Sequence, residues 1–201
     1  MRMATTANTP TSAFVDTPLS RQSDWSLTAP GPDHAELDLI FDSALRAPDH
    51  GGLCRWRCVV IRNEARAELA KVLFDIAIVR DPHTPHAVHE QRSQTAYVAP
   101  VIIALGAVVT HGSHVPEIEQ FLSRGAAAMN LLNAIHALGY GGVWATGPHA
   151  YDSDLRDALD FDPSVHLLGF LLVGSRVDTG AEPTRPARFR HVREWFGRTS
   201  I

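Results

Sequence analysis

An almost unbroken apolar run at residues 99–109 constrains the fold of this 201-residue chain most strongly. Val101, Ile102, Ile103 and Leu105 lie in it, and no charged residue interrupts it. A strand with one face in water alternates apolar and polar residues, whereas a strand buried on both faces is apolar throughout. The run therefore predicts a sheet strand that is covered on both sides.

Helical and extended patterns share the rest of the chain. Helices are predicted at residues 33–45, 64–79, 116–138 and 153–159, and further strands at residues 56–61 and 167–173. The first helix begins at Asp33 with Glu36 three residues later, which is typical of a capping box. Residues 81–92 carry three histidines and two prolines and are predicted to be a loop or irregular insertion. This order indicates an α+β or α/β layered domain.

Composition limits the partners and the surroundings of the chain. Its net charge is −4, which gives no argument for binding nucleic acid or an anionic membrane. Residues 1–18 are rich in Thr, Ala, Ser and Pro and lack an apolar core, so we expect a flexible tail before a single domain at residues 19–201. Residues 125–144 come nearest to a membrane span but hold Asn130 and Asn133, so a helix buried in a soluble core is expected.

Cys54 and Cys58 are the only cysteines. Two thiols four positions apart indicate no disulfide framework and favour a reducing cytoplasm. On a strand they would face the same side, as small core hydrophobes. They do not form a Cys-x-x-Cys redox pair.

The connection at residues 46–56 combines two side chains that can be cationic, Arg46 and His50, with two glycines and Trp56. A plain turn needs its Pro, Asp and Gly but not the Arg, His and Trp beside them. One interpretation is a loop that grips an anionic, aromatic ligand. The other is structural, with Arg46 as a favourable cation at a helix C-terminus. The residues of this loop leave both open.

Two further segments have properties suited to a ligand. Arg21, Gln22 and Ser23 can hold a phosphate through charge and a hydroxyl, or can be solvated surface. In residues 139–147, glycines permit close backbone approach, Trp144 can pack on a flat ring and the Thr at position 146 offers a hydroxyl. The structural alternative is a helix end followed by a short strand. No dinucleotide or phosphate-loop fingerprint is present.

Three equally spaced histidines, His83, His86 and His89, raise the hypothesis of a metal site. Pro82 and Pro85 argue against one helical face, and no Cys or carboxylate pattern completes the ligand set. We therefore expect no metal there. The chain also has no Ser-His-Asp order or nucleophile elbow that would indicate a hydrolase.

Taken in order, five segments resemble the nitroreductase family. They are residues 21–23, 27–30, 46–57, 139–147 and 168–174. The resemblance runs from about residue 20 to residue 183 and is most specific in the Arg-Ala-Pro-Asp-His sequence at residues 46–50. It implies an α+β fold around a mixed sheet flanked by helices, FMN bound without a covalent link, and an intertwined homodimer with FMN at the subunit interface.

The same resemblance implies roles for residues near the two ends of the flavin. Arg21, Gln22 and Ser23 match the segment that holds the ribityl phosphate. Arg46 and His50 match the residues that reach the flavin from the partner subunit. A cation at the pyrimidine edge would stabilise the anionic reduced ring, and these two residues are candidates for it.

Trp144, Ala145 and Thr146 match the segment that lines the other side of the flavin, and Ala134 matches a position associated with the nicotinamide dinucleotide. Gln22 and Ala145 depart from the family pattern, in which relatives often carry Arg or a similar polar residue. Each departure removes a possible charge near the phosphate. A basic residue of the C-terminal segment is a candidate to replace it.

The resemblance implies an oxidoreductase that passes hydride from NADH or NADPH through FMN to a small acceptor such as a nitroaromatic or a quinone. The flavin carries such chemistry, so no catalytic side chain is expected. A flavin-binding dimer without turnover and a specialised flavin enzyme of the same fold remain alternatives.

Overall fold

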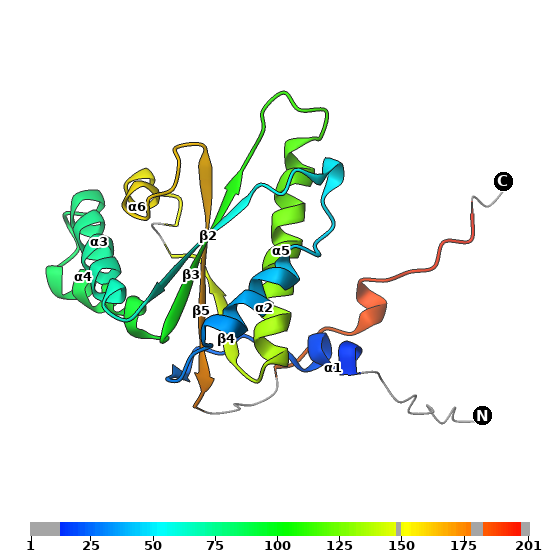
Figure 1. Cartoon of the computed structure of the whole chain (residues 1–201), viewed down its shortest axis with the longest axis horizontal. Helices are drawn as coiled ribbons and strands as arrows, with labels where there is room; N and C mark the ends of the chain where they lie inside the picture. The colour runs from blue at the N-terminus through cyan, green and yellow to red at the C-terminus, as the bar shows by residue number, and fades with distance from the viewer. Residues whose placement is uncertain (1–12, 148–149, 178–182, 198–201) are drawn as a thin grey trace.

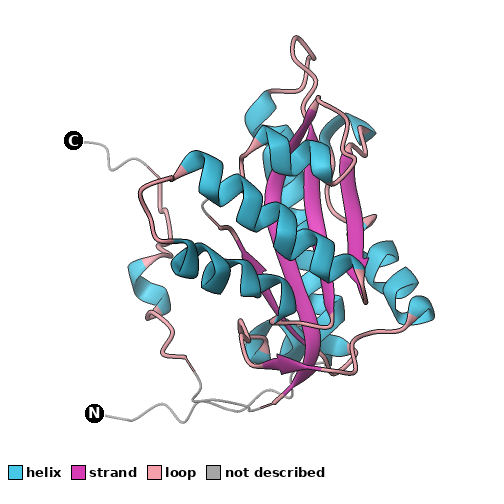
Figure 2. Cartoon of the chain, turned by 90° about the vertical axis from the view of Figure 1, so that its left-hand side faces the viewer, coloured by secondary structure: helices cyan, strands magenta, loops and turns pink. Residues whose placement is uncertain are grey.

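The computed structural model describes residues 13–147, 150–177 and 183–197. Within them, one sheet has helices on both faces, so the predicted α+β architecture is confirmed (Figures 1 and 2). Its strands are β1 (Leu27–Thr28), β2 (Trp56–Arg62), β3 (Val101–Val108), β4 (Gly141–Ala145) and β5 (Val165–Arg176).

Strand β5 is the centre of the sheet and pairs with β1, β3 and β4, while β2 pairs with β3. Strands β3 and β4 both run antiparallel to β5, so they run in the same direction, but β5 lies between them. Every strand pairing among the described residues is therefore antiparallel. This corrects the mixed sheet that the family resemblance implied, because no two neighbouring strands of the described chain are parallel.

The prediction of a strand buried on both faces is confirmed in β3. Its residues from Val101 to Leu105 are at most 4% exposed. Ile103 belongs to the core formed with helices α2 (His34–Ala44) and α5 (Glu117–Ala137). Ile102 belongs to the opposite core, with helix α3 (Ala65–Arg80). The apolar residues of β3 thus pack against helices on both faces of the sheet and contribute to both cores.

The other described helices are α1 (Ala13–Ser20), α4 (His86–Ser93) and α6 (Ser153–Ala158), with short 3₁₀ turns η1 (His50–Gly52), η2 (Gln94–Tyr97) and η3 (Arg188–Arg190). The capping box is confirmed, because Asp33 Oδ1 accepts from Glu36 N and Glu36 Oε2 accepts from Asp33 N, both at 2.9 Å. Among the described helices, none combines the length and apolarity needed to cross a bilayer.

Three local predictions differ from the structure. Helix α4 occupies residues 86–93, where a loop was predicted, because Pro85 lies at its N-cap and its missing N–H costs no helical hydrogen bond there. Helix α1 begins within the predicted tail, of which residues 1–12 lie outside the described residues. Cys54 precedes β2 with φ +44° and is exposed, whereas burial raises the pKa of Cys58 to about 12.

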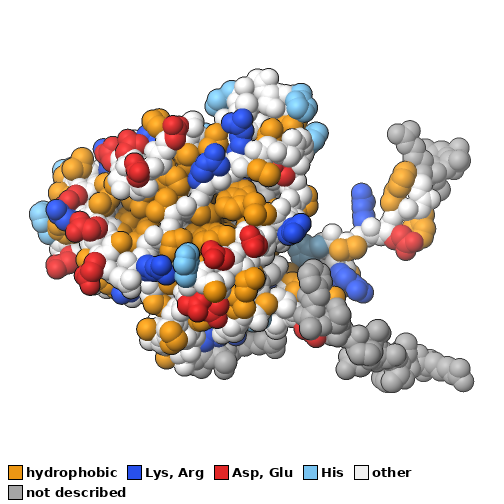
Figure 3. Space-filling view, viewed as in Figure 1, with side chains coloured by type: hydrophobic (Ala, Val, Ile, Leu, Met, Phe, Trp, Pro, Cys, Tyr) orange, Lys and Arg blue, Asp and Glu red, His pale blue; other side chains and the backbone are white. Residues whose placement is uncertain are grey.

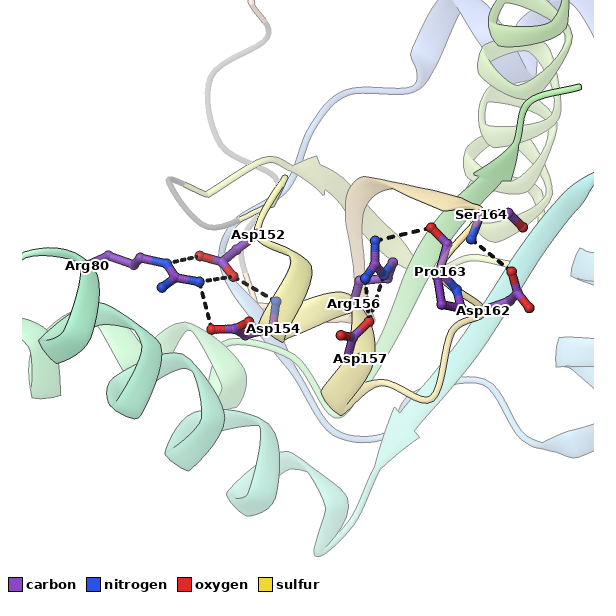
Figure 4. Close-up of polar contacts among 8 residues, drawn as sticks. All are labelled: Arg80, Asp152, Asp154, Arg156, Asp157, Asp162, Pro163 and Ser164. Atoms are coloured by element: carbon purple, nitrogen blue, oxygen red, sulfur yellow. Dashed lines mark hydrogen bonds and ion pairs between the residues drawn. The ribbon is translucent and has the colours of Figure 1, made fainter. Parts of the chain in front are cut away.

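Helix α6 is attached to α3 by Arg80 (Figure 4). Arg80 Nε donates to Asp152 Oδ2 at 2.8 Å, and its Nη2 donates to Asp154 Oδ2 at 2.7 Å. Asp152 also caps α6 by accepting from the backbone N–H of Asp154. These contacts fix the start of α6, which follows the Trp144–Gly147 segment in the chain.

Gly169 allows β5 to pass the end of β4. Its φ is +116°, and a Cβ at this position would lie 2.5 Å from the backbone oxygen of Ala145. We expect Gly169→Ala to lower the free energy of unfolding by more than the roughly 1–3 kcal/mol of backbone strain alone, measured by urea denaturation. Gly139→Ala is the control, because Gly139 has φ +90° and nothing within 4 Å of its added Cβ. Equal losses in the two variants would contradict a close approach at Gly169.

Candidate functional site

Arg21 follows α1 and presents buried nitrogen atoms without partners. Its Nε and Nη1 have no hydrogen-bond acceptor among the described residues. Burial, and then repulsion by Arg185, lower the pKa of Arg21, while Asp24 acts in the opposite direction. A guanidinium hardly ever loses its proton, so a buried one needs an anion beside it. The geometry therefore fits an anionic ligand at Arg21.

Arg185 brings a second cation to the same place. Its Nη2 donates to the backbone oxygen of Arg21 at 3.1 Å. A cavity of about 230 Å³ lies here and is lined by Leu19, Ser20, Gln22, Pro183 and Arg185. Arg185 is thus a basic residue of the C-terminal segment that can replace the positive charge missing at Gln22. Arg185 lies 164 positions after Arg21 in the sequence, so residue spacing could not predict that the two are in contact.

The Arg21–Asp24 segment runs beside strand β4. Gln22 Nε2 donates to Asp24 Oδ1 at 3.3 Å, and Ser23 is exposed. The backbone N–H of Asp24 donates to the oxygen of Gly142 at 3.3 Å. Asp24 is 7% exposed and forms an ion pair with Arg176, with Oδ2 and Nε 3.1 Å apart.

Sequence reasoning did not assign a role to His136, in the last turn of α5. Arg176 Nη2 donates to its Nδ1, so its Nε2 carries the proton and lies 2.8 Å from Ser20 Oγ. Burial, followed by the charges of Arg176 and Arg21, lowers the pKa of His136. The imidazole is therefore held neutral, which limits repulsion among the cations around it.

Trp144, Ala145 and Thr146 form the end of β4 and the residue after it. Trp144 is 36% exposed, and its Nε1 donates to the oxygen of Leu168 at 3.0 Å. Ala145 and Thr146 line a largely apolar cavity of about 500 Å³ on the α3 side of the sheet. Trp25 lines the same cavity, so the segment that begins at Arg21 and the end of β4 meet at one edge of the sheet. The volume is typical of small-molecule sites.

Arg46 and His50 lie elsewhere. The Arg46 side chain is exposed, and no hydrogen bond or ion pair joins it to a described residue. His50 Nδ1 lies 2.5 Å from Glu119 Oε2, in the first turn of α5. At a rise of about 1.5 Å per residue, Glu119 and His136 are about 25 Å apart along the helix. His50 therefore lies near the N-terminal end of α5, whereas Ser20, next to Arg21, lies near its C-terminal end (Figure 1). Arg46 lies between these ends, because its backbone N–H donates to Ser43, whose Oγ donates to the backbone oxygen of Asn130 on α5.

The remaining predicted positions have structural surroundings. Ala134 is half-buried and packs in the core between α5 and α2. His89 is 1% exposed, and its Nε2 donates to the oxygen of Asp81 at 2.9 Å, while His86 packs edge-on to Phe74. In the part of the chain that the structure describes, no three metal-binding side chains converge.

Comparison with known proteins places this geometry in a family. The model of the nitroreductase family matches residues 19–175. "Putative NAD(P)H nitroreductase YdjA" of Escherichia coli K12 is 31% identical over 157 residues, which cover 78% of this chain and 85% of that protein.

Two solved structures share the fold. The nitroreductase-like family protein from Bacillus cereus has a TM-score of 0.78 at 17% identity and covers 95% of this chain and 100% of its own. A nitroreductase from Desulfovibrio desulfuricans, solved in complex with FMN, has a TM-score of 0.71 at 23% identity and covers 94% and 100%. With a family model that matches most of its length and the same arrangement of strands and helices, the chain belongs to the nitroreductase family.

Proposed function

We propose that the chain is an FMN-dependent NAD(P)H oxidoreductase that works as a homodimer. The observation that carries the proposal is the pair of buried, unpartnered nitrogens of Arg21 beside Arg185. A phosphate accepts hydrogen bonds from both guanidinium groups and balances their charge. The names of the relatives support the same assignment, since one is an NAD(P)H nitroreductase and one was solved with FMN.

The residues of the chain divide the work of binding. Arg21 and Arg185 would hold the phosphate, with Gln22 and Ser23 beside it, and Trp144–Thr146 would line the ring. Bound FMN supplies the hydride chemistry, taking hydride from NADH or NADPH and passing it to a small acceptor such as a nitroaromatic or a quinone. The largely apolar cavity beside Ala145 and Thr146 would offer the ring an apolar surface on this side. Ala134 remains the predicted contact of the nicotinamide dinucleotide.

The separation between His50 and Arg21 supports a homodimer. A second copy of the chain would bring its Arg46 and His50 to a flavin held by Arg21 and Trp144. Apolar surface is available for such a contact: the exposed residues are Ile118, Leu122 and Met129 on α5, and Phe189, Val192, Trp195 and Phe196 on the projecting C-terminal segment (Figure 3). Where exposed apolar side chains form a contiguous patch, they mark interaction sites.

The purified protein should be yellow, and the flavin absorbance should bleach on anaerobic addition of NADH or NADPH. An absorbance spectrum recorded before and after each reductant tests this. A colourless protein that takes up no added FMN contradicts the proposal. A yellow protein that neither reductant bleaches supports the alternative of a flavin-binding dimer without turnover.

Arg21→Gln should raise the Kd for FMN about 10- to 100-fold, because it removes charge-assisted hydrogen bonds of roughly 1.5–3 kcal/mol. Quenching of flavin fluorescence measures the Kd. Riboflavin is the matched control ligand, because it lacks the phosphate and should bind both proteins alike. Arg188→Gln is the control variant, since Arg188 is an exposed arginine of the same C-terminal segment. Equal weakening of FMN and riboflavin by Arg21→Gln would exclude a phosphate contact.

Arg46→Ala should weaken FMN retention while the dimer stays folded, as checked by sedimentation and circular dichroism. If the site is shared, mixing Arg46→Ala chains with Arg21→Gln chains restores tight FMN binding at one site of each mixed dimer. The restored site takes its Arg21 from one chain and its Arg46 from the other. No recovery after subunit exchange, shown complete by mass spectrometry, would mean that each chain builds its own site.

A further inference from the structure

Two side chains attach the loop at residues 46–54 to helix α5. Asp49 Oδ1 accepts from Ser123 Oγ at 3.2 Å, and its Oδ2 accepts from the backbone N–H of Cys54 at 2.5 Å. His50 makes the second attachment, through Glu119. The loop that carries Arg46 and His50 is thus held in place by residues of the α5 N-terminal half.

The contact between His50 and Glu119 determines which nitrogen of the imidazole is available. A carboxylate only accepts hydrogen bonds, so Nδ1 of His50 carries a proton and donates it to Glu119 Oε2, 2.5 Å away. His114 packs edge-on against the His50 ring, with centroids 6.2 Å apart and planes at 86°. The ring is therefore restrained from two sides, and its other nitrogen, Nε2, is left for a ligand on this 58% exposed side chain.

The charged groups around His50 come from three segments. Glu119 belongs to α5, His114 to the loop before α5, and Asp49 to the loop of His50 itself. Glu117 is not among them, because it pairs with His111 at 2.6 Å. Among the described residues, one carboxylate thus contacts His50, and the same first turn of α5 holds a similar pair, Glu117 with His111, that does not involve the loop.

Resting on the proposed function, we infer that Glu119 is a positioning residue for the flavin bound chiefly by the partner subunit. It holds His50 through Nδ1, which leaves Nε2 to donate toward the pyrimidine edge of the ring when the flavin is bound. If reduction places negative charge on the bound flavin, Nε2 would take up a proton from a solvent hydronium ion, which becomes water, and would donate it in a hydrogen bond to that charge. The Glu119 carboxylate balances the imidazolium that forms.

Glu119→Gln tests this, because it keeps the size and an accepting oxygen but removes the charge. We expect the affinity for reduced FMN to fall about tenfold, as for loss of one charge-assisted hydrogen bond, with a smaller change for oxidised FMN. The midpoint potential of the bound flavin should fall accordingly. Glu119→Asp keeps the carboxylate and should recover part of the loss.

Glu117→Gln is the matched control, because Glu117 lies in the same first turn and also pairs with a histidine. It should change neither the potential nor the affinity for reduced FMN. Equal effects of the two variants would assign the change to the helix N-terminus and overturn the inference. An unchanged potential in Glu119→Gln, with its thermal unfolding unchanged, would overturn it as well.

Nitrogen-15 NMR of the histidine rings in flavin-free protein separates this inference from the proposed function. The spectrum should show His50 protonated at Nδ1 in the wild type, with its signal identified by His50→Gln. Wild-type protein that binds no flavin contradicts the proposed function, whatever the ring shows. Wild-type protein that binds flavin but has His50 protonated only at Nε2 contradicts the role of Glu119 alone.

Discussion

The length and rigidity of helix α5 determine where the parts of the candidate site lie. The helix has 21 residues, and seven of them, from Gln120 to Ile135, are buried against α2 and the sheet. Its first turn holds the loop of His50 through Glu119, and its last turn holds Ser20 and Arg176 through His136. A helix packed along its length keeps its two ends apart, and with them His50 and Ser20. This separation supports the proposed second subunit.

The proposed phosphate end of the site carries more positive than negative charge. Three guanidinium groups, Arg21, Arg176 and Arg185, gather near a single carboxylate, Asp24. The ion pair with Asp24 neutralises Arg176, and the neutral form of His136 adds no further charge. Asp24 attracts Arg21 but is paired with Arg176, so the buried Nε and Nη1 of Arg21 have no hydrogen-bond partner among the described residues, while Arg185 is exposed. Leaving buried donors of a cation unpaired is costly. The flavin-free state is therefore poised to gain from an anionic ligand.

Local sequence patterns predicted those helices and strands whose own residues have a distinctive apolar or capping pattern. The apolar run predicted β3, and Asp33 with Glu36 predicted the start of α2. The prediction was wrong for α4. The prolines and histidines of this segment are typical of a loop, but Pro85 lies at the N-cap, where a missing N–H breaks no helical hydrogen bond. The sequence patterns did not predict the roles of Arg185, His136 and Glu119, because their hydrogen-bond partners lie 164, 116 and 69 positions away in the sequence. The family resemblance named the candidate site residues and implied that Arg46 and His50 serve the partner's flavin, and the structure places His50 and Arg21 near different ends of α5.

The two departures from the family pattern have different physical contexts. Gln22 removes a possible cation from the phosphate segment, but Arg185 stands beside Arg21 and supplies positive charge from the other end of the chain. Ala145 lines the apolar cavity, where a charged side chain would lose its hydration against Phe170 and the neighbouring wall. At Gln22, the positive charge is therefore supplied by another residue, Arg185, rather than lost. The second keeps charge out of a wall that favours an apolar, aromatic surface, which is what a flavin ring or a quinone presents.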